Sequence, residues 1–344
     1  MPGSRDLPPL TTPFFPRVFI KNQFRAKIRY PPKSTDLSGQ AAIITGSNTG
    51  LGYESARQLL SIKLSHLIIA VRSVHKGTEA ANRLKASFHK ATIEVWELDM
   101  SSYDSIQAFA HRADTGLSRL DIVILNAGVY KWKFATVPGT GHEETIQINY
   151  LSTALLAVLL LPVLRQKSPS GRTGRMTIVN SALAFTAKFK NRDKTLLLPS
   201  FDDPQNFAGA DYYGISKLLG QMFLWKLMDY VSGEEVIVNM VDPGAIGGTK
   251  LGRDTPGPWV VIAKLFELVV TRNLPDGAAA YIDASVMRGP ESHGAFIMGW
   301  EIAPFALLLY TREGKQLMDK LWRETIDELG FAKPLVVLES MKSH

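Results

Sequence analysis

The chain has 344 residues, of which 45% are hydrophobic, and it carries a formal net charge of +7. This length is sufficient for one large α/β domain with appendages. Because the chain has no cysteine and its seven histidines show no metal-binding spacing, disulfides and thiol nucleophiles are excluded and we expect no metal site.

Residues 1–37 are predicted to form a basic and aromatic arm. Residues 1–36 hold seven basic and two acidic residues, so the body that follows is too nearly neutral to present an extended nucleic-acid-binding face. The stretch FFPRVFIKNQFRAKIRY could contact a membrane surface or a partner. We favour the alternative that its phenylalanines pack onto the domain while prolines prevent regular structure. The first ten residues lack a signal-peptide pattern, so we expect a cytoplasmic protein.

From residue 40, short apolar runs alternate with helical patterns. The predicted strands are residues 41–45, 67–71, 93–98, 122–125, 176–180 and 236–241. Between them, apolar residues recur at spacings of three and four, as at Ile106, Phe109 and Ala110. The longest apolar run, 151–164, is shorter than a membrane span. Apolar strands that alternate with helices are typical of a parallel sheet with both faces covered, so we predict one Rossmann-type, doubly wound α/β domain over residues 38–335.

The octet TGSNTGLG, residues 45–52, lies between the first predicted strand and a predicted helix over 51–60. Gly46 would allow a tight turn, Gly50 the close approach of a phosphate, and Gly52 the close packing of helix on strand. The amides at the start of the helix would face a pyrophosphate. Taken alone, the octet is equally compatible with a tight strand-to-helix turn that binds nothing.

Further motifs follow in an order that resembles the short-chain dehydrogenase/reductase family. The glycine octet is followed by Asn126-Ala127-Gly128, Asn149, Ser181, Tyr213 with Lys217, and Pro243-Gly244. Within the family, TGSNTGLG, AVRSVHKG and GKQLMDKLW look most like the retinol-dehydrogenase-like branch and fungal biosynthetic reductases. A lone tyrosine with lysine four residues later is weak evidence. Here the pair lies between the fifth and sixth predicted strands, as in the family.

The resemblance implies a catalytic set of four residues. Tyr213 would act as the general acid, and Ser181 would hydrogen-bond the substrate oxygen. Lys217 would hold the nicotinamide ribose and lower the pKa of Tyr213, and Asn149 would order the water that returns the proton. Taken singly, Ser181 is equally a strand-end cap and Asn149 a buried amide bonded to backbone.

The resemblance also implies a dinucleotide site. NAD-preferring relatives carry an acid at the end of the second strand, where this chain has Val71 followed by Arg72. An arginine can bind the 2′-phosphate of NADPH, so we predict NADP(H); the alternative is that Arg72 only ends the strand in solvent. The predicted cofactor contacts are Gly46, Ser47, Asn48, Thr49, Gly50, Leu51, Gly52, Arg72, Asp99, Met100, Asn126, Ala127, Gly128, Tyr213, Lys217, Pro243, Gly244, Ile246 and Thr249.

Two regions are predicted to shape the substrate site. As in the family, residues 245–300 would form a lid, and its apolar residues would suit a bulky apolar ketone or aldehyde, although they could equally pack in a core or a subunit contact. These residues are Trp259, Val260, Ile262, Leu265 and Phe266. The long interval from 181 to 213 predicts an inserted loop, either a substrate wall or a surface excursion.

The C-terminal part completes the predicted domain. A stripe of apolar residues predicts a terminal core helix before a tail over 336–344, and comprises Leu317, Met318, Leu321, Trp322 and Leu329. The helices at 151–164 and around Tyr213 resemble the family's dimer-forming pair, so a homodimer is possible unless the arm covers that surface.

The whole pattern predicts NADPH-dependent reduction of a carbonyl group in a bulky apolar metabolite, in secondary-metabolite biosynthesis. Two alternatives stay open. The same fold and cofactor could serve enone reduction, epimerisation or cyclisation, or the chain could be a non-catalytic nucleotide-binding scaffold. We expect an apolar small-molecule substrate, no nucleic acid and no transmembrane segment.

Overall fold

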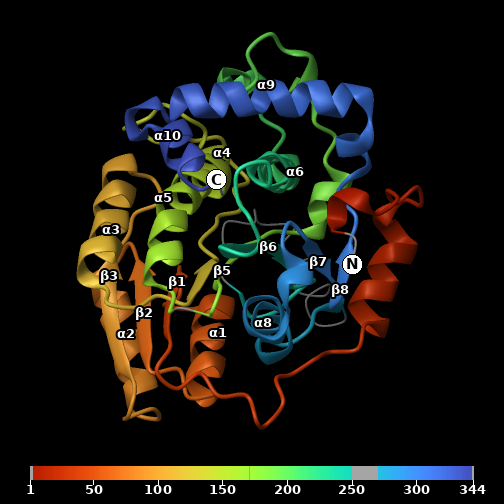
Figure 1. The fold of residues 1–344 in the computed structure, drawn as a ribbon. Coiled ribbons are helices and arrows are strands. Elements are labelled where there is room, and N and C mark those ends of the chain that lie inside the picture. Colours follow the sequence, from red (N-terminus) through yellow and green to blue (C-terminus); the bar gives the residue numbers. More distant parts are fainter. Residues whose placement is uncertain (1–2, 170, 250–269, 343–344) are drawn as a thin grey trace.

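An eight-stranded sheet forms the centre of the protein in the computed structural model, which describes residues 3–169, 171–249 and 270–342 (Figure 1). The strand order is β3-β2-β1-β4-β5-β6-β7-β8. All neighbouring strands pair in parallel except β7 and β8. The strands are β1 (Ala41–Thr45), β2 (His66–Val71), β3 (Thr92–Glu97), β4 (Ile122–Leu125), β5 (Gly174–Val179), β6 (Val236–Asp242), β7 (Phe296–Met298) and β8 (Glu301–Ala303). The predicted doubly wound α/β fold is confirmed.

Helices cover both faces of the sheet. They are α1 (Gly50–Ser61), α2 (Val74–Lys85), α3 (Tyr103–Gly116), α4 (Glu144–Ile146), α5 (Ser152–Lys167), α6 (Ala210–Leu227), α8 (Leu274–Ile282), α9 (Arg312–Glu328) and α10 (Pro334–Glu339). Apolar side chains of α1, α2 and α8 share one core cluster, and those of α3, α5, α6 and α9 share the other. Successive residues of β1 contribute to opposite clusters, Ile43 to one and Ile44 to the other, because side chains alternate along a strand.

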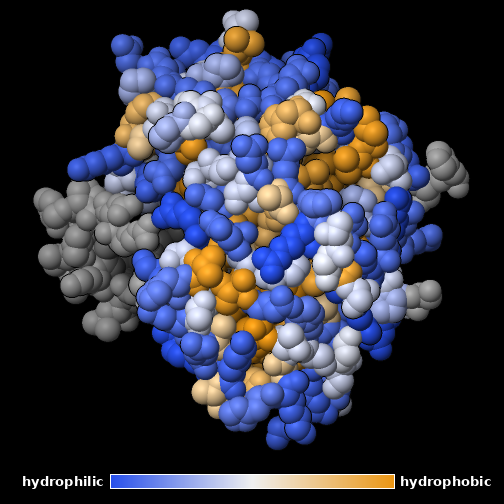
Figure 2. Space-filling model, turned by 90° about the vertical axis from the view of Figure 1, so that its left-hand side faces the viewer, coloured by the Kyte–Doolittle hydropathy of each residue, from blue (hydrophilic) through white to orange (hydrophobic). Residues whose placement is uncertain are grey.

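The six predicted strands are all present, with ends that differ by up to two residues. β7 and β8 were not among them, because three residues are too few to show a strand pattern. They form a hairpin that turns at Gly299 and Trp300, both of which have positive φ. At the opposite edge, β3 is exposed at its two end residues and carries charge, with Glu94 paired to His66 at 2.7 Å. Figure 2 shows that this side of the molecule is largely hydrophilic with separate apolar patches, as expected for an edge strand that avoids pairing.

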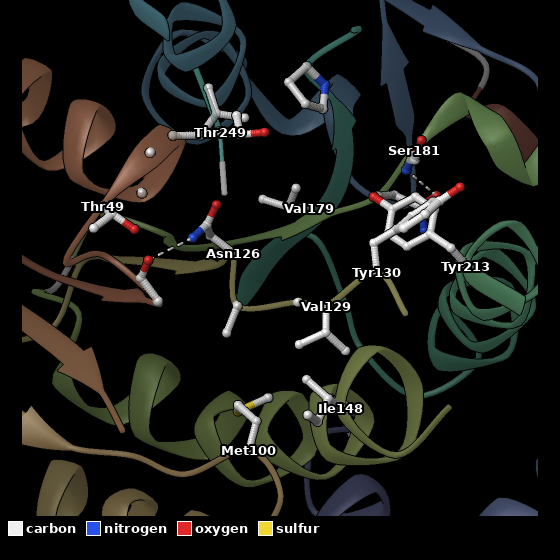
Figure 3. A pocket seen from close by; sticks show the side chains of 18 of the residues that line it. Thr49, Met100, Asn126, Val129, Tyr130, Ile148, Val179, Ser181, Tyr213 and Thr249 are labelled. Carbon is white, nitrogen blue, oxygen red and sulfur yellow. Dashed lines mark hydrogen bonds between the residues drawn. The ribbon is translucent and has the colours of Figure 1, made fainter. Parts of the chain in front are cut away.

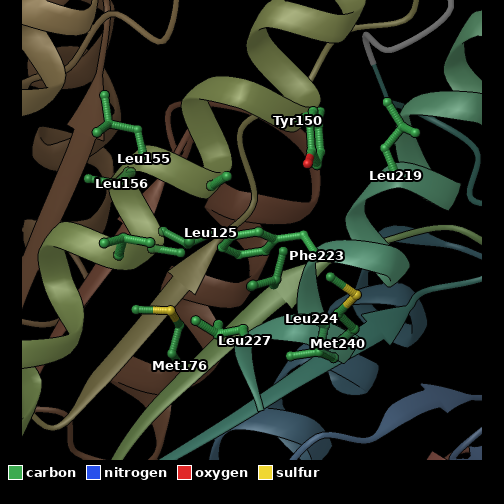
Figure 4. Close-up of a cluster of buried hydrophobic side chains, with 14 of the residues drawn as sticks. Leu125, Tyr150, Leu155, Leu156, Met176, Leu219, Phe223, Leu224, Leu227 and Met240 are labelled. Atoms are coloured by element: carbon green, nitrogen blue, oxygen red, sulfur yellow. The ribbon is translucent and has the colours of Figure 1, made fainter. Parts of the chain in front are cut away.

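The largest core cluster lies where α5 and α6 pack on β4, β5 and β6 (Figure 4). Leu155 and Leu156 of α5 are fully buried, as are Leu219 and Leu224 of α6. One continuous helix, Glu144–Lys167, is long and apolar enough to cross a membrane, but 89% of its most apolar window is buried inside the fold. The expectation that this segment is too short to span a membrane is therefore wrong, because the helix extends beyond residues 151–164; its burial inside the fold accounts for its apolar composition.

The C-terminal helices pack over α5 and α6. The Trp322 ring on α9 stacks on Phe223 of α6 at 5.9 Å between centroids, and Thr325 bonds to the Tyr150 hydroxyl at 2.6 Å. The surface predicted for a dimer is therefore packed against helices of the same chain. The boundary predicted at residue 335 falls inside α10, and Leu338 and Met341 are fully buried, so residues 336–342 belong to the domain.

The inserted segment after β5 packs into the larger core cluster, which includes its Leu197 and Leu198. It contains short 3-10 turns, including Lys190–Asp193 and Pro199–Phe201, and it buries Phe189 and Phe201. The carboxylate of Glu324 on α9 accepts the backbone N–H groups of Leu197 and Leu198 at 2.7 to 2.9 Å. The insertion is thus attached to α9.

The arm is partly helical, which contradicts the prediction that its prolines prevent regular structure. Helical turns span Phe14–Val18, apart from the extended Phe15, and Lys21–Arg25. Proline is tolerated at the start of a helix, where its missing N–H is not needed. Phe14 is buried and stacks on Phe185 at 5.8 Å, as predicted, whereas Phe24 is 55% exposed.

We predict that Gly314→Ala destabilises the fold by about 2 kcal/mol or more, because a Cβ at this position in α9 would overlap the carbonyl oxygen of Leu308. Urea unfolding followed by circular dichroism measures the change. Gly330→Ala is the matched control, since a Cβ there meets no atom within 4 Å. Equal stability of the two variants would contradict the packing described here.

Candidate active site

The carboxyl ends of the central strands open into one cleft of about 420 Å³. Its lining includes Ala70 of β2, Val179 of β5 and Asp242 of β6. A crevice beyond the carboxyl ends of parallel strands is where doubly wound folds bind ligands. Every predicted site residue lines this cleft except Ser47 and Asn149. Figure 3 shows the cleft with Thr49 at one end, and with Ser181, Tyr130 and Tyr213 gathered at the other.

The glycine turn forms the floor at the first end. Gly46 and Gly50 have φ of +67° and +60°, which glycine adopts readily. A Cβ on Gly52 would lie 2.6 Å from Asn126 Nδ2, so only glycine lets α1 pack this closely. A Cβ on Gly50 would meet nothing within 4 Å, and no side chain caps the first turn of α1 at Thr49. Uncapped helix amides beside open space suit the pyrophosphate of a dinucleotide.

The turns after β1 and β4 are held together by hydrogen bonds. The Thr45 hydroxyl oxygen accepts the backbone N–H groups of Asn126 and Ala127, both at 2.9 Å. The Asn126 amide nitrogen donates to the Thr45 carbonyl at 2.8 Å, and its oxygen accepts from the Tyr281 hydroxyl at 3.1 Å. Tyr281 lies on α8, far along the chain, and no local sequence signal marks it. Ser47 is fully buried and donates to the Ile44 carbonyl at 2.7 Å, so it supports the turn from behind.

Arg72 and Asp99 follow β2 and β3 at the same end of the cleft. Arg72 is exposed, lines the cleft, and has no hydrogen-bond or ion-pair partner within the described parts of the chain. One Asp99 oxygen accepts from the N–H and hydroxyl of Ser101 at 2.9 and 2.6 Å. The guanidinium is therefore available to an anionic ligand, whereas Asp99 is fixed by its neighbour.

Tyr213 and Lys217 project from α6 at the other end. The Tyr213 side chain is buried and is hydrogen-bonded to the Ser181 side chain. Ser181 also accepts the Leu183 N–H at 3.2 Å, so it is a cap as well as a partner of Tyr213. Lys217 Nζ donates to the Val179 carbonyl at 2.9 Å and lies 5.5 Å from the centre of the Tyr213 ring.

The predicted effect of Lys217 on the tyrosine is wrong in this structure. Burial, followed by the negative charge of Asp242, raises the pKa of Tyr213 well above its usual value. Burial also lowers the pKa of Lys217 itself to about 8. Removal from water disfavours both the phenolate of Tyr213 and the ammonium of Lys217. A prediction from the attraction between these two charges leaves this effect out.

Asp242 ends β6 beside this pair and was not among the predicted site residues, although it directly precedes the predicted Pro243. It accepts the N–H of Ala182 at 3.0 Å and that of Gly244. Burial raises its pKa to about 6, against the lowering effect of these hydrogen bonds and of nearby Arg272. A buried carboxylate, a lysine and a phenol therefore share this end of the cleft.

Asn149 lies behind the cleft wall, in a π-helical turn, Gln147–Leu151. Its oxygen accepts the Val129 N–H at 2.8 Å, and its amide donates to the Val129 carbonyl at 2.8 Å and the Ser216 hydroxyl at 3.1 Å. This geometry matches the alternative of an amide bonded to backbone. A second cavity, about 10 Å³ in volume and lined by Asn149 and Lys217, lies nearby; this is close to the least space that a single water needs.

Aromatic residues form the wall next to Tyr213. The rings of Tyr130 and Tyr213 lie 5.0 Å apart, and Trp132 packs against Tyr130 at 5.4 Å. These residues directly follow the Asn-Ala-Gly motif, which is the sequence signal that could have identified them. Lys131 and Glu144 form an ion pair at 3.0 Å and also line the cleft.

The structure corrects part of the prediction that residues 245–300 form a lid. Its apolar residues Trp259, Val260, Ile262, Leu265 and Phe266 lie outside the described residues. Residues 274–298 form α8, short turns and β7, and so belong to the core layers rather than to a lid. Ile246 and Thr249 do line the cleft. No residue from 182 to 209 lines the cleft, and the structure describes all of these residues.

Known proteins resemble the chain over its whole length. The family model described as short chain dehydrogenase matches residues 40–191. The short chain dehydrogenase/reductase mfmJ of Annulohypoxylon moriforme is 58% identical over 344 residues, which are 100% of each chain. The short chain dehydrogenase virL of Hypocrea virens is 42% identical over 90% of this chain and 91% of that relative. These relatives are fungal, and the first of them extends through the arm.

Solved structures share the fold at lower identity. The Pseudomonas aeruginosa RhlG/NADP active-site complex has a TM-score of 0.58 and 22% identity, and covers 79% of this chain and 96% of its own. The short-chain dehydrogenase from Sphingobium yanoikuyae in complex with NADPH has a TM-score of 0.56 and 19% identity, with 84% and 95% covered. At these identities the likeness concerns the fold alone.

We predict that Lys217 makes stability depend on pH. Its pKa in the folded protein, about 8, is below its ordinary value of 10.5. The folded state therefore bears the cost of the buried charge below about pH 8, and this cost disappears as the pH rises towards 10.5. Relative to Lys217→Met, the wild type should gain about 2 kcal/mol between pH 7 and pH 10. Urea unfolding of both proteins at each pH tests this, and a constant difference would contradict it.

Proposed function

Because the chain belongs to the short-chain dehydrogenase/reductase family, we propose that it is an NADPH-dependent oxidoreductase that transfers a hydride to the carbonyl carbon of a bulky apolar ketone or aldehyde. The observation that carries this proposal is the meeting of Tyr213, Ser181 and Lys217 at one end of a cleft whose other end is the glycine turn. The fungal relatives support a setting in secondary-metabolite biosynthesis.

The residues at the glycine end fit a phosphorylated dinucleotide. The first turn of α1 would bind the pyrophosphate, as its amides carry the positive end of the helix dipole. Arg72 would bind the 2′-phosphate with paired donors, and Val71 before it leaves no carboxylate to repel that group. When bound, NADPH supplies the hydride for the reaction.

The chemistry of the other end suits proton donation. The raised pKa of Tyr213 keeps the phenol protonated near neutrality, so the hydroxyl can donate to the substrate oxygen as negative charge develops there. Ser181, bonded to the same hydroxyl, would hold that oxygen in place. A protonated phenol is the form that donation to a carbonyl oxygen requires.

Return of the proton requires a path from solvent. Lys217 lines both the main cleft and the small cavity behind it, and Asn149 lines that cavity as well. A water in the small cavity would lie between Lys217 and the residues of α5 and α6 that line it. In this proposal Asn149 acts by fixing Val129 and the cavity wall, since its side chain is already bonded there.

The wall beside Tyr213 supports an apolar substrate. Tyr130 presents a half-buried ring to the cleft, and Val129 and Ile148 also line it. Pockets lined by apolar and aromatic side chains with a few polar groups bind compact apolar ligands. A polar group of a substrate that faces Tyr130, Val129 and Ile148 would find few partners there.

We predict that Tyr213→Phe lowers kcat about 10²-fold or more, while the Kd for NADPH changes less than about twofold, because the variant loses only the proton donor. NADPH oxidation, followed by absorbance with a panel of ketones, aldehydes and enones and with product analysis, measures this. Tyr212→Phe is the matched control, a buried neighbour on α6 that does not line the cleft.

The same assay separates the alternatives. A saturated product from an enone, or a rearranged product, would assign the fold and cofactor to another reaction. NADPH binding with no turnover of any compound would favour the scaffold. A Tyr213→Phe enzyme that reduces its substrate at the parent rate would remove the proposed mechanism.

We predict that Arg72→Asp lowers kcat/KM with NADPH by about 10- to 100-fold and narrows or reverses the preference over NADH, because a charge-assisted bond to the 2′-phosphate is replaced by repulsion. Steady-state rates with both coenzymes measure the ratio. Lys76→Asp makes the same change of charge at an exposed residue of α2 outside the cleft. An unchanged ratio in Arg72→Asp would show that this arginine does not read the phosphate.

A further inference from the structure

The arm places one buried polar side chain against the wall of the cleft. Most residues around Gln23 are exposed, including Lys21, Phe24 and Arg25, yet Gln23 itself is only 5% exposed. Figure 1 shows the arm beside β7 and β8. A glutamine is rarely buried unless its amide is satisfied, so its partners indicate what it does.

Gln23 makes three hydrogen bonds to the backbone that follows β6. Its oxygen accepts the N–H of Ala245 at 3.0 Å, and its amide nitrogen donates to the Ala245 carbonyl at 2.9 Å. The same nitrogen donates to the Val270 carbonyl at 2.8 Å. One side chain thus satisfies both backbone groups of Ala245 and joins that residue to another point far along the chain.

The turn is built around this contact. Gly244 has φ of +83°, and a Cβ there would lie 2.8 Å from the Gln23 oxygen and 3.0 Å from Arg272 Nη1. Arg272 donates from Nε to the Gln23 carbonyl at 3.1 Å and also bonds to the Asn22 carbonyl. Only a residue without a side chain lets the arm approach the turn this closely.

The turn that Gln23 contacts, residues 243–249, borders the cleft. Pro243, Gly244, Ile246 and Thr249 all line it, and Ala245 lies in their midst. A parallel bridge between Ile246 and Arg272 continues the same network. Displacement of Ala245 would therefore move the residues that border the cleft on either side of it.

We propose that Gln23 is a positioning residue for the cofactor pocket, through which the arm holds the turn 243–249 in its binding geometry. The inference rests on the proposed function for the identity of the ligand, NADPH. The family model begins at residue 40, so it covers none of the arm. The arm is on this account a part of the active-site structure and not an appendage.

Two variants of Gln23 and one control test the proposal. Gln23→Met keeps the length of the side chain and removes all three hydrogen bonds, and Gln23→Glu keeps the acceptor but loses both donors. Ser4→Ala is the matched control in the arm. Ser4 is fully buried, donates to the Ala303 carbonyl at 2.6 Å and accepts the Phe296 N–H at 2.7 Å, on β8 and β7 and outside the cleft.

Hydrogen–deuterium exchange of the cofactor-free proteins and titration with NADPH provide two readouts. Both Gln23 variants should speed exchange in the peptide 243–249 and raise the Kd for NADPH about tenfold, with Ser4→Ala changing neither. All three variants can lower the temperature of unfolding, so that loss is not the test. If Gln23→Met does not fold, the exchange rate and the Kd of Gln23→Glu alone are compared with those of the wild type.

Two outcomes overturn the inference. One is a folded Gln23 variant that binds NADPH as tightly as the wild type; the other is exchange in peptide 243–249 that matches the wild type. A wild type that does not bind NADPH would instead overturn the proposed function. The exchange experiment needs no cofactor, so the two failures are distinguishable.

Discussion

The parallel alignment of β1, β4, β5 and β6 is the constraint on which the site depends, because it places the loops after these strands along one edge of the sheet. The glycine turn, the Asn-Ala-Gly motif, Ser181 and Asp242 come from four separate parts of the chain, yet they meet there. The Thr45 hydroxyl then ties the first two loops together through two backbone N–H groups. The cleft forms at this edge because the strands run in the same direction. The hydrogen bonds from the Thr45 hydroxyl hold two of its loops in place.

Burial governs the electrostatics at the reactive end. Tyr213, Lys217 and Asp242 are each less than a tenth exposed, and burial is the first cause of the shift in the pKa of each. It raises the pKa of the two acids and lowers that of the base, so the site disfavours isolated charge. A carbonyl oxygen that acquires negative charge beside the phenol would accordingly find a proton donor close at hand.

The C-terminal helices, the insertion and the arm pack on different parts of the molecule. The C-terminal helices occupy the outer surface of α5 and α6, and the insertion after β5 binds α9 instead of the cleft. The arm reaches the turn after β6 through Gln23. Similarity to the Annulohypoxylon moriforme relative over the full length is consistent with an arm that packs as part of the domain.

The sequence by itself determined the fold class, the first six strands and most of the cleft residues, because these depend on local apolar patterns and on motifs whose order follows the strands. It could not place Tyr281 in the cleft, bring Gln23 to the turn after β6, or show that α9 covers α6, since each of these depends on contacts between residues far apart in the chain. Asp242 was within its reach, because it directly precedes the predicted Pro243. The sequence also predicted the wrong direction for the pKa of Tyr213. The number of charges near a group can be read from a sequence, but its removal from water is decided only when the tertiary structure closes around it.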